Sequence, residues 1–531
     1  MTGSRLAFAL ACGAALLAGG QDGWAQASAP KAAQPITASA IDSTVARAMS
    51  AFQVPGMAVA IVKDGKVVFA RGYGVRVVDR PGAVDVDTLF QIGSNTKAFT
   101  AAALAILVDE GKIRWDDKVI DYLPEFRLQD PYVTREFTIR DLLTHRSGLG
   151  TGAGDLMFYP ATDMTRQEIV RGLRFLKPVS SFRSRYDYDN LLYMVAGQIV
   201  LAVTGKSWED FVEERIIAPL GMKGCAASDG RIRDRGDVAS PHSVIDGKVS
   251  AIPVVRMDAI GPAGTINCNV SGMAKWLNVQ LSEGVIPGGG RLFSSDRSSE
   301  MWSLVTPMPA GALAALYHTN FTGYGLGWAV SDVLGHKRVA HTGAVGGSVT
   351  WVTMVPDLKL GIVVLTNQES SPAMEAVGGQ ILDAYLGAPT RDWVAMAEAY
   401  ARDKGAAADT VEADVARTIA SAGPPTLPLD SYAGRYVDAW RGAVDVRREG
   451  ARLVLRFSRT TQLEGALLPF KGDTFVVRWN DRSLHADAFV RFEPGFDGRV
   501  AGITMRAVSP ATDFSFDFQD LDLRRSEGPR P

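Results

Sequence analysis

Residues 94–110 are the segment that most restricts the fold of this chain. After Lys97 they are almost entirely apolar, and Gly111 follows at the position where helices commonly end. A helix that is apolar on every side is buried on every side, so it requires a large surrounding core. The chain has 531 residues, of which 47% are hydrophobic and 21% charged, so it can build such a core. We therefore predict a large globular domain around a central helix.

The segments that flank this helix give an order of elements. Apolar residues recur at helical spacing before it, at Ile41, Val45, Met49 and Phe52. Two strands joined by an Asp-Gly turn are predicted next, at 57–62 and 66–71. Helical patterns dominate residues 165–220, and strand patterns return later, at 338–341, 348–354 and 360–366. The predicted order is strand, helices, strand.

The character of the sequence changes after Leu386. Residues 391–420 predict a surface helix rich in Ala and charge, and a Pro-bearing break follows at 421–428. Beyond it, residues 429–526 form a separate domain of about 95 residues, a small antiparallel barrel or sandwich. Strand patterns occur in it at 444–447, 452–457, 474–479, 488–492 and 514–518. Its aromatic residues predict a barrel core, namely Trp440, Phe475, Trp479 and Phe489.

The N-terminal residues predict export. A short basic start, an apolar run and small residues around Ala25 and Ala27 indicate a signal peptide over residues 1–27, followed by a tether at 28–37. A lipoprotein anchored at Cys12 fits less well, because Ala9 stands where a lipobox usually has Leu. No later apolar stretch is long enough to span a membrane, so we expect an exported, periplasmic protein. Cys225 and Cys268 could pair there, which the sequence alone leaves open.

The first candidate for chemistry is the pair Ser94 and Lys97 at the start of the apolar helix. Their spacing places both side chains on one face, where the Ser94 hydroxyl and the Lys97 amine can meet. A lysine in a desolvated pocket can have a pKa low enough to take the serine proton, which makes the serine a nucleophile. Alone, the pattern is weak, because a capping serine beside a solvated lysine has the same spacing.

Two further motifs follow at places where they could serve the same chemistry. Tyr188 and Asn190 precede a helix, and a tyrosine beside a lysine can exist as phenolate or relay a proton, with Tyr186 as its competitor. Asn190 could instead only cap that helix. His341, followed by Thr342 and Gly343, ends a strand where a cleft is expected, although a turn with a surface histidine would have the same pattern.

The order of the three motifs, S-x-x-K, Y-x-N and H-T-G, is typical of penicillin-recognising serine enzymes. The chain resembles the serine hydrolases of the class C β-lactamase, D-alanyl-D-alanine carboxypeptidase and family VIII esterase group. Other stretches support this resemblance, at 90–93, 142–149, 218–222 and 323–328. It covers residues 38–386 and implies an α/β fold of the serine β-lactamase/transpeptidase type, an antiparallel sheet flanked by helices plus an all-helical region. Residues 387–428 would be a helical linker, and the domain at 429–526 resembles a lipocalin-like β-barrel.

The resemblance also implies roles for the site residues. Ser94 would be the acylated nucleophile, Lys97 its proton acceptor, and Tyr188 the base that passes the proton to the leaving group and later activates water. Asn190 would contact the substrate, and His341 would bind or polarise it. The backbone N–H groups of Ser94 and Ala344, beside Gly343, would form the oxyanion hole. No cofactor or metal is implied.

The third motif departs from the family pattern, because β-lactamases of this group have lysine where His341 stands. A histidine is mostly neutral near pH 7, so the fixed cation for a β-lactam carboxylate is missing. We therefore expect an exported peptidase or amidase that forms an acyl-enzyme on short peptides. The alternatives are a family VIII-type carboxylesterase or weak β-lactamase, and a non-catalytic module that binds peptides.

Other functional classes find no support in the sequence. Lysine and arginine total 56 against 58 acidic residues, a net charge of −2, which argues against nucleic-acid binding. No G-x-S-x-G turn, phosphate-binding loop or zinc-ligand spacing is present. His145 lies in a loop stretch shared by the family and is expected to be structural. The expected partner is a small peptide or acyl substrate, and the C-terminal domain could also mediate homo-oligomers.

Overall fold

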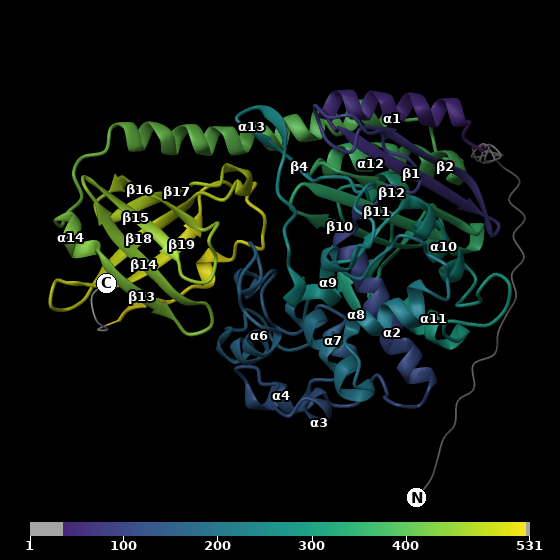
Figure 1. Cartoon of the computed structure of the whole chain (residues 1–531), viewed down its shortest axis with the longest axis horizontal. Coiled ribbons are helices and arrows are strands. Elements are labelled where there is room, and N and C mark those ends of the chain that lie inside the picture. Colours follow the sequence, from purple (N-terminus) through teal and green to yellow (C-terminus); the bar gives the residue numbers. More distant parts are fainter. Residues whose placement is uncertain (1–34, 527–531) are drawn as a thin grey trace, which may run out of the picture.

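The computed structural model describes residues 35–526, and its two bodies are joined by one long helix (Figure 1). The predicted signal peptide at 1–27 and residues 28–34 of the tether predicted at 28–37 lie outside the described residues. The larger body contains a mixed sheet-and-helix domain, and the smaller one is a β-barrel (Figure 1). The helix α13 (Trp393–Ala420) runs along one side of both (Figure 1). This is the fold class that the sequence predicts.

An antiparallel sheet of eight strands forms the centre of the larger body. In pairing order its strands are β2 (Lys66–Gly74), β1 (Gly56–Lys63), β12 (Leu360–Thr366), β11 (Ser348–Val355), β10 (His336–Val345), β9 (Ala329–Val333), β8 (Thr322–Tyr324) and β7 (Thr306–Met308). The hairpin predicted near the N-terminus therefore pairs with the strand predicted at 360–366, in the register Val59 opposite Val364. The sheet thus joins the two ends of the domain.

Helices cover both faces of this sheet because successive side chains of a strand point to opposite faces. On β1, Met57, Val59 and Ile61 pack into a core with α1 (Ala38–Phe52) and α12 (Ser371–Leu386). Ala58, Ala60 and Val62 pack into the larger core on the other face, beside α10 (Val270–Leu281). Every residue of β1 up to Val62 is buried, so the strand reads as a continuous apolar run.

The apolar segment at 94–110 forms the central helix of the larger core. A single 3₁₀ turn at Gly93–Asn95 leads into α2 (Thr96–Asp109), whose residues are buried from Thr96 to Leu107. It packs against α7 (Leu191–Thr204), α8 (Trp208–Val212) and α9 (Gly261–Gly264). Gly111 has a φ of 67°, the left-handed conformation expected after a helix end. The prediction of a buried central helix is confirmed.

The remaining elements of the larger body are short. Its other helices are α3 (Val119–Tyr122), α4 (Pro131–Glu136), α5 (Ile139–Leu142), α6 (Arg166–Gly172) and α11 (Ser295–Met301). Two small two-stranded sheets pair β3 (Phe90–Gln91) with β6 (Asn267–Cys268) and β4 (His242–Ile245) with β5 (Lys248–Ala251). Within residues 35–526 no single helix has the length and apolar character to cross a membrane; α7 and the helix at 208–217 pass that test only as a bent pair.

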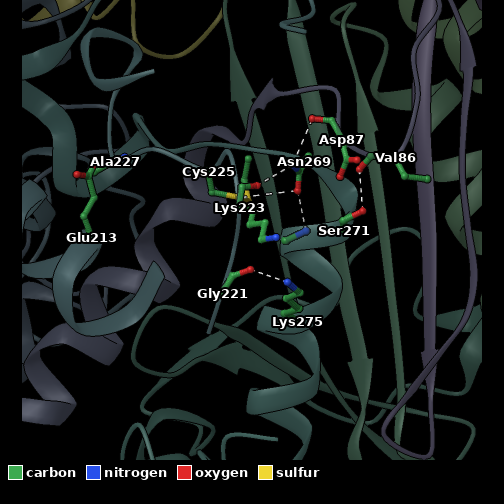
Figure 2. The surroundings of a disulfide bond; sticks show 12 residues. Val86, Asp87, Glu213, Gly221, Lys223, Cys225, Ala227, Asn269, Ser271 and Lys275 are labelled. Carbon is green, nitrogen blue, oxygen red and sulfur yellow. Dashed lines mark hydrogen bonds between the residues drawn. A yellow bond between two sulfur atoms is a disulfide. The ribbon is translucent and has the colours of Figure 1, made fainter. Parts of the chain in front are cut away.

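Cys225 and Cys268 form a disulfide, which settles the pairing that the sequence left open (Figure 2). The bond ties the loop after residue 222 to the start of α10. Gly272 leaves room for it, because a Cβ there would lie 2.5 Å from the Cys225 sulfur. Asn269 closes the same junction: its Oδ1 accepts from the Gly272 N–H at 2.7 Å, and its amide donates to the Lys223 carbonyl at 3.0 Å (Figure 2).

The smaller body is a closed antiparallel barrel that follows α14 (Leu429–Tyr432). Its strands are β13 (Gly434–Asp438), β14 (Gly442–Glu449), β15 (Arg452–Phe457), β16 (Glu464–Lys471), β17 (Thr474–Trp479), β18 (Ala488–Pro494), β19 (Val500–Ala507) and β20 (Leu523–Arg525). Trp440, Phe475 and Trp479 are buried as predicted. Phe489 instead packs on the outside of the barrel, in a cluster with Val415 of α13.

The prediction of a strand at 514–518 is wrong. The sequence alternates Phe, Ser, Phe, Asp, Phe there, but the residues form turns and a short 3₁₀ helix at Phe518–Asp520. The physical reason is burial on two sides: Ser515 to Asp517 are all buried, because the segment lies between the barrel and the larger body. Alternation along a sequence predicts a strand only where one side faces solvent.

Candidate active site

Ser94 lies in the 3₁₀ turn that leads into α2, and strand β11 fixes this turn from outside. The Thr350 hydroxyl donates to the Ile92 carbonyl at 2.8 Å, and the Asn95 amide donates to the same hydroxyl at 2.8 Å. One side chain of the sheet thus contacts both sides of Ser94. The turn is therefore held to the sheet by hydrogen bonds and not by packing alone.

Two glycines let the Ser94 turn touch strand β10. A Cβ on Gly93 would lie 2.7 Å from the Ala344 nitrogen, and a Cβ on Gly343 would lie 2.0 Å from the Ile92 carbonyl oxygen. Gly93 also has a φ of 52°, which favours glycine. Ser94 and Ala344 both line one cavity, so the structure brings together the two residues from which the predicted oxyanion hole would come.

Lys97 is fully buried, and its Nζ lies 2.9 Å from the Ser94 hydroxyl. The same nitrogen lies 2.7 Å from Asn190 Oδ1 and 3.1 Å from the Ala263 carbonyl oxygen. Both of these oxygens only accept hydrogen bonds. A neutral amine has two hydrogens and one lone pair, so the two oxygens take the hydrogens and the lone pair is left for the Ser94 O–H. Burial lowers the pKa of Lys97 to about 7.

Tyr188 is the tyrosine that faces this pair. The Lys97 nitrogen lies 4.7 Å from the centre of its ring. Burial raises the pKa of Tyr188 well above its usual value of 10, and a hydrogen bond with Ser94 acts against that rise. The side chain is therefore a phenol and not a phenolate near neutral pH. Tyr186, the competitor in the sequence, instead packs against His145 and Tyr324.

His341 lies on β10 in the same cavity, but both of its ring nitrogens have partners. Nδ1 lies 2.6 Å from the carbonyl oxygen of Thr342, and because that oxygen only accepts, Nδ1 carries the proton. Nε2 then accepts from the Tyr324 hydroxyl, 2.8 Å away. Burial lowers the pKa of His341 to about 3, so the ring is neutral. Sequence reasoning missed Tyr324 as its partner, although Tyr324 belongs to the 323–328 stretch.

His145 supports Tyr188 from behind. Its Nδ1 accepts the backbone N–H of Asp189 at 3.0 Å, and its ring lies 4.3 Å from the Tyr188 ring. Burial lowers the pKa of His145 well below 6.5, so it is uncharged. These contacts agree with the structural role that the sequence predicts for this residue.

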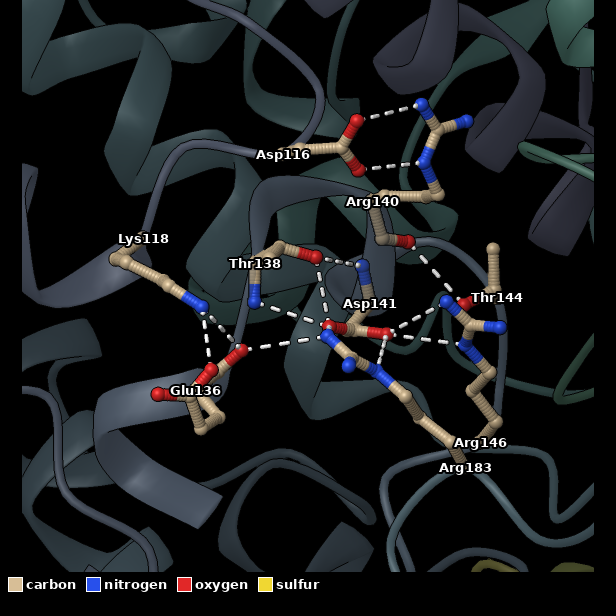
Figure 3. Close-up of polar contacts among 9 residues, drawn as sticks. All are labelled: Asp116, Lys118, Glu136, Thr138, Arg140, Asp141, Thr144, Arg146 and Arg183. Carbon is tan, nitrogen blue, oxygen red and sulfur yellow. Dashed lines mark hydrogen bonds and ion pairs between the residues drawn. The ribbon is translucent and has the colours of Figure 1, made fainter. Parts of the chain in front are cut away.

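A buried carboxylate fixes the loop that carries His145 (Figure 3). Asp141 accepts hydrogen bonds from Arg146 at 3.0 Å and from Arg183 at 2.5 Å, and it caps its own short helix through Thr138 (Figure 3). Burial alone would raise the pKa of Asp141, but the bonds from Arg183 and Thr138 outweigh it and lower the pKa. Asp141 thus ties the 145–148 loop to the 183–190 loop, which carries Tyr188.

Three buried carboxyl groups, two near Lys97 and one beside Asp155, were not predicted from the sequence. Asp155 Oδ2 accepts from the Asn190 amide at 2.8 Å, Asp189 follows Tyr188 directly, and Asp517 comes from the barrel. Burial raises the pKa of each, that of Asp189 to about 7. Their place at the site is visible only from contacts in the folded structure, because a single aspartate forms no recognisable sequence motif.

The cavity in front of Ser94 has a volume of about 1070 Å³ and three sets of walls. The larger body contributes Phe158 and Met257, α13 contributes Ile419, and the barrel contributes Val508 and Phe514. Tyr159 lies beside Phe158 in this wall, whereas no residue of the loop at 311–321 lines the cavity. Within residues 35–526 no cluster of side chains could hold a metal ion.

Two family profiles match the chain. The Beta-lactamase family profile matches residues 41–386, and that of a domain of unknown function, DUF3471, matches residues 420–525. The chain is 29% identical over 478 residues to "Unguisins hydrolase ungD'" of Aspergillus campestris (strain IBT 28561), with 86% of each protein covered. It is 32% identical over 333 residues to "Penicillin-binding protein 4" of Amycolatopsis lactamdurans, with 59% of this chain and 81% of the other covered.

A solved structure shares the fold over most of the chain. The octameric penicillin-binding protein homologue from Pyrococcus abyssi superposes with a TM-score of 0.60 at 22% identity, covering 92% of this chain and 100% of the other. At this identity the likeness concerns the fold alone.

Proposed function

This chain belongs to the beta-lactamase family of serine hydrolases, related to penicillin-binding proteins, and from that premise we propose that it is an exported peptidase or amidase acting through an acyl-enzyme on Ser94. One observation carries the proposal. The two hydrogens of a neutral Lys97 amine are taken by Asn190 Oδ1 and the Ala263 carbonyl, so its lone pair faces the Ser94 hydroxyl at 2.9 Å. A serine next to such a base is an activated nucleophile.

The acylation step follows from this arrangement. Ser94 Oγ attacks the substrate carbonyl while its proton moves to the Lys97 amine, which becomes an ammonium. The negative charge that develops on the carbonyl oxygen would be stabilised by the backbone N–H groups of Ser94 and Ala344, an electrostatic contribution that is commonly large. Collapse of the tetrahedral intermediate breaks the bond to the leaving nitrogen, and that nitrogen needs a proton.

Tyr188 would deliver this proton. As a phenol, it can donate its proton to the leaving nitrogen and then take a proton from the Lys97 ammonium, whose nitrogen lies 4.7 Å from the centre of its ring. In the second half, water attacks the acyl-enzyme and gives one proton to the neutral Lys97 amine, and Lys97 passes that proton to Ser94 Oγ as Ser94 leaves as the alcohol. The net reaction adds one water across the amide bond. Tyr188 therefore acts as a relay and not as a permanent phenolate.

The state of His341 favours a peptide over a β-lactam as substrate. A neutral ring with both nitrogens engaged offers no cation for a β-lactam carboxylate. In this proposal His341 holds Tyr324, and the apolar cavity walls contact the substrate. Two arginines of the barrel, Arg478 and Arg482, also line the cavity, but both form ion pairs with Asp487.

Export is part of the proposal and is supported by the disulfide. Disulfides persist in oxidising compartments such as the periplasm, and Cys225 and Cys268 are bonded here. Self-association, described for the octameric Pyrococcus abyssi homologue, is a further part of it.

The proposal is tested with a substrate panel. The purified protein and its Ser94→Ala variant are incubated with short L- and D-peptides, acyl p-nitrophenyl esters and a chromogenic cephalosporin, and products are read by mass spectrometry. We expect the wild type to cleave peptide amide bonds, and Ser94→Ala to be slower by on the order of 10⁴-fold or more, because the nucleophile is gone. Turnover of esters alone would replace the peptidase by an esterase. Equal peptide cleavage by both proteins would overturn the proposal.

A further inference from the structure

One segment of the barrel, Asp513–Phe518, reaches into the larger body beside the catalytic residues. The Phe514 ring lies 5.8 Å from the Tyr188 ring. Gly152 makes room for the segment: its φ is 71°, and a Cβ there would lie 2.7 Å from both the ring and the carbonyl oxygen of Phe514. The surfaces of the two bodies are therefore complementary at this point.

Asp517 holds the chain on both sides of Asp155. Its Oδ2 accepts from the Gly154 N–H at 2.7 Å, and its Oδ1 accepts from the Leu156 N–H at 3.0 Å. The carboxyl group is completely buried. A buried carboxyl group costs stability unless its oxygens are hydrogen-bonded, and here both bonds go to the backbone that carries Asp155. The barrel thus fixes where Asp155 stands.

Ser515 fixes the side chain of Asp155 itself. Its hydroxyl donates to Asp155 Oδ2 at 2.9 Å, the same oxygen that accepts from the Asn190 amide at 2.8 Å. Because Asp155 Oδ2 accepts, the amide nitrogen of Asn190 must face it. The other end of the amide, Oδ1, then faces Lys97, 2.7 Å away. A reversed amide would place N–H groups against the amine and would compete for its lone pair.

We propose that the C-terminal domain supplies two positioning residues, Ser515 and Asp517, which hold Asp155 and through it the orientation of Asn190 on Lys97. The inference rests on the proposed acylation of Ser94 and adds that the barrel is part of the active site. Asp517 is fully buried, and Ser515 lines the cavity but is only 8% exposed, with its hydroxyl donated to Asp155. They act through a series of hydrogen bonds that runs from Ser515 to Asp155, Asn190 and Lys97.

This series of hydrogen bonds should affect the pKa of Lys97, which can be measured. When Asp155 and Asp189 are ionised, their negative charge raises the pKa of Lys97, against the larger effect of burial. The Ser515 hydroxyl favours ionisation of Asp155. Loss of that hydroxyl leaves Asp155 less charged, so the pKa of Lys97 falls. The other titratable groups around Lys97 are Tyr188, Tyr193, His145 and His341.

The test compares acylation of Ser94 in the full-length wild type and in Ser515→Ala, with a fluorophosphonate and a p-nitrophenyl ester as probes across a pH series. We expect Ser515→Ala to acylate on the order of 10-fold to 100-fold more slowly at its optimum, with KM for the ester nearly unchanged, because the base is misplaced while the cavity is intact. The acidic limb of its pH profile should move to lower pH. Ser515→Thr should restore most of the rate, because it keeps the hydroxyl.

Ser458→Ala, the same change on an exposed barrel serine, is the matched control and should behave as wild type. If the wild type reacts and Ser515→Ala has the same acylation rate and the same pH profile, this inference is overturned while the proposed function stands. A loss that Ser515→Thr does not restore, or that Ser458→Ala shares, would also overturn it. If Ser94 of the wild type does not react with either probe, both the proposed function and this inference fail. Asp517→Asn, which keeps one acceptor oxygen, should show a loss in the same direction.

Discussion

Lys97→Met is expected to lower kcat/KM for peptide cleavage on the order of 10³-fold, because it removes the only base in contact with the Ser94 hydroxyl in the described structure. In the wild type, the neutral amine is the active form and its pKa is about 7. Activity should therefore rise as the pH rises through about 7. The residual activity of Lys97→Met should no longer rise with pH in this range.

The methionine variant should stay folded. Its side chain has nearly the shape of lysine, and a buried amine is replaced by an apolar group that costs nothing to desolvate. The unfolding temperature measures this, with Lys275→Met, an exposed lysine away from the cavity, as the control. Full activity in a folded Lys97→Met, or a pH limb that persists near 7 in it, would contradict the role of this lysine.

Asp141→Asn is expected to destabilise the larger body by about 3–5 kcal/mol, because it leaves Arg146 and Arg183 without their buried carboxylate. The Asp141 side chain is 0% exposed, so water cannot replace it. Denaturant unfolding followed by tryptophan fluorescence measures the loss as a shift of the transition. Activity should fall as well, since the two loops that Asp141 joins carry His145 and Tyr188.

Asp116→Asn is the matched control for this prediction. Asp116 pairs with Arg140, the residue before Asp141 (Figure 3), but the Asp116 side chain is 74% exposed. An exposed ion pair contributes only about 0–1 kcal/mol, so the control should unfold nearly as the wild type does. Equal shifts for the two variants would show that the Asp141 cluster is not the anchor that its burial indicates.

The parts of the fold that depend on local pattern could be predicted from the sequence. The apolar run after Lys97 gave the buried helix α2, and the Asp-Gly turn gave the β1–β2 hairpin. Ser94 and Lys97 stand three residues apart, so the start of the helix alone brings them together. Tyr188 and His341 required the order of motifs and the resemblance, because their distance from Ser94 along the chain is large.

The contribution of the barrel could not be predicted in this way. Ser515 contacts Asp155 across 360 residues, and Asp517 contacts Gly154 across 363. No periodicity records a contact between two domains, and the segment that makes it alternates like a strand. The same holds for Tyr324 and His341: local sequence gives each residue a place, and only the antiparallel sheet brings the hydroxyl to the ring.

The identity of the nucleophile is the central claim, and one measurement tests it most directly. The wild type is acylated with a fluorophosphonate, digested, and the modified residue is located by mass spectrometry. We predict one adduct per chain, on the peptide that contains Ser94. The structure offers a competitor, because the Ser243 hydroxyl lies 2.5 Å from Glu369 and 3.0 Å from His485, which both line the same cavity. An adduct on Ser243 with Ser94 unmodified, or no adduct at all, would contradict the account.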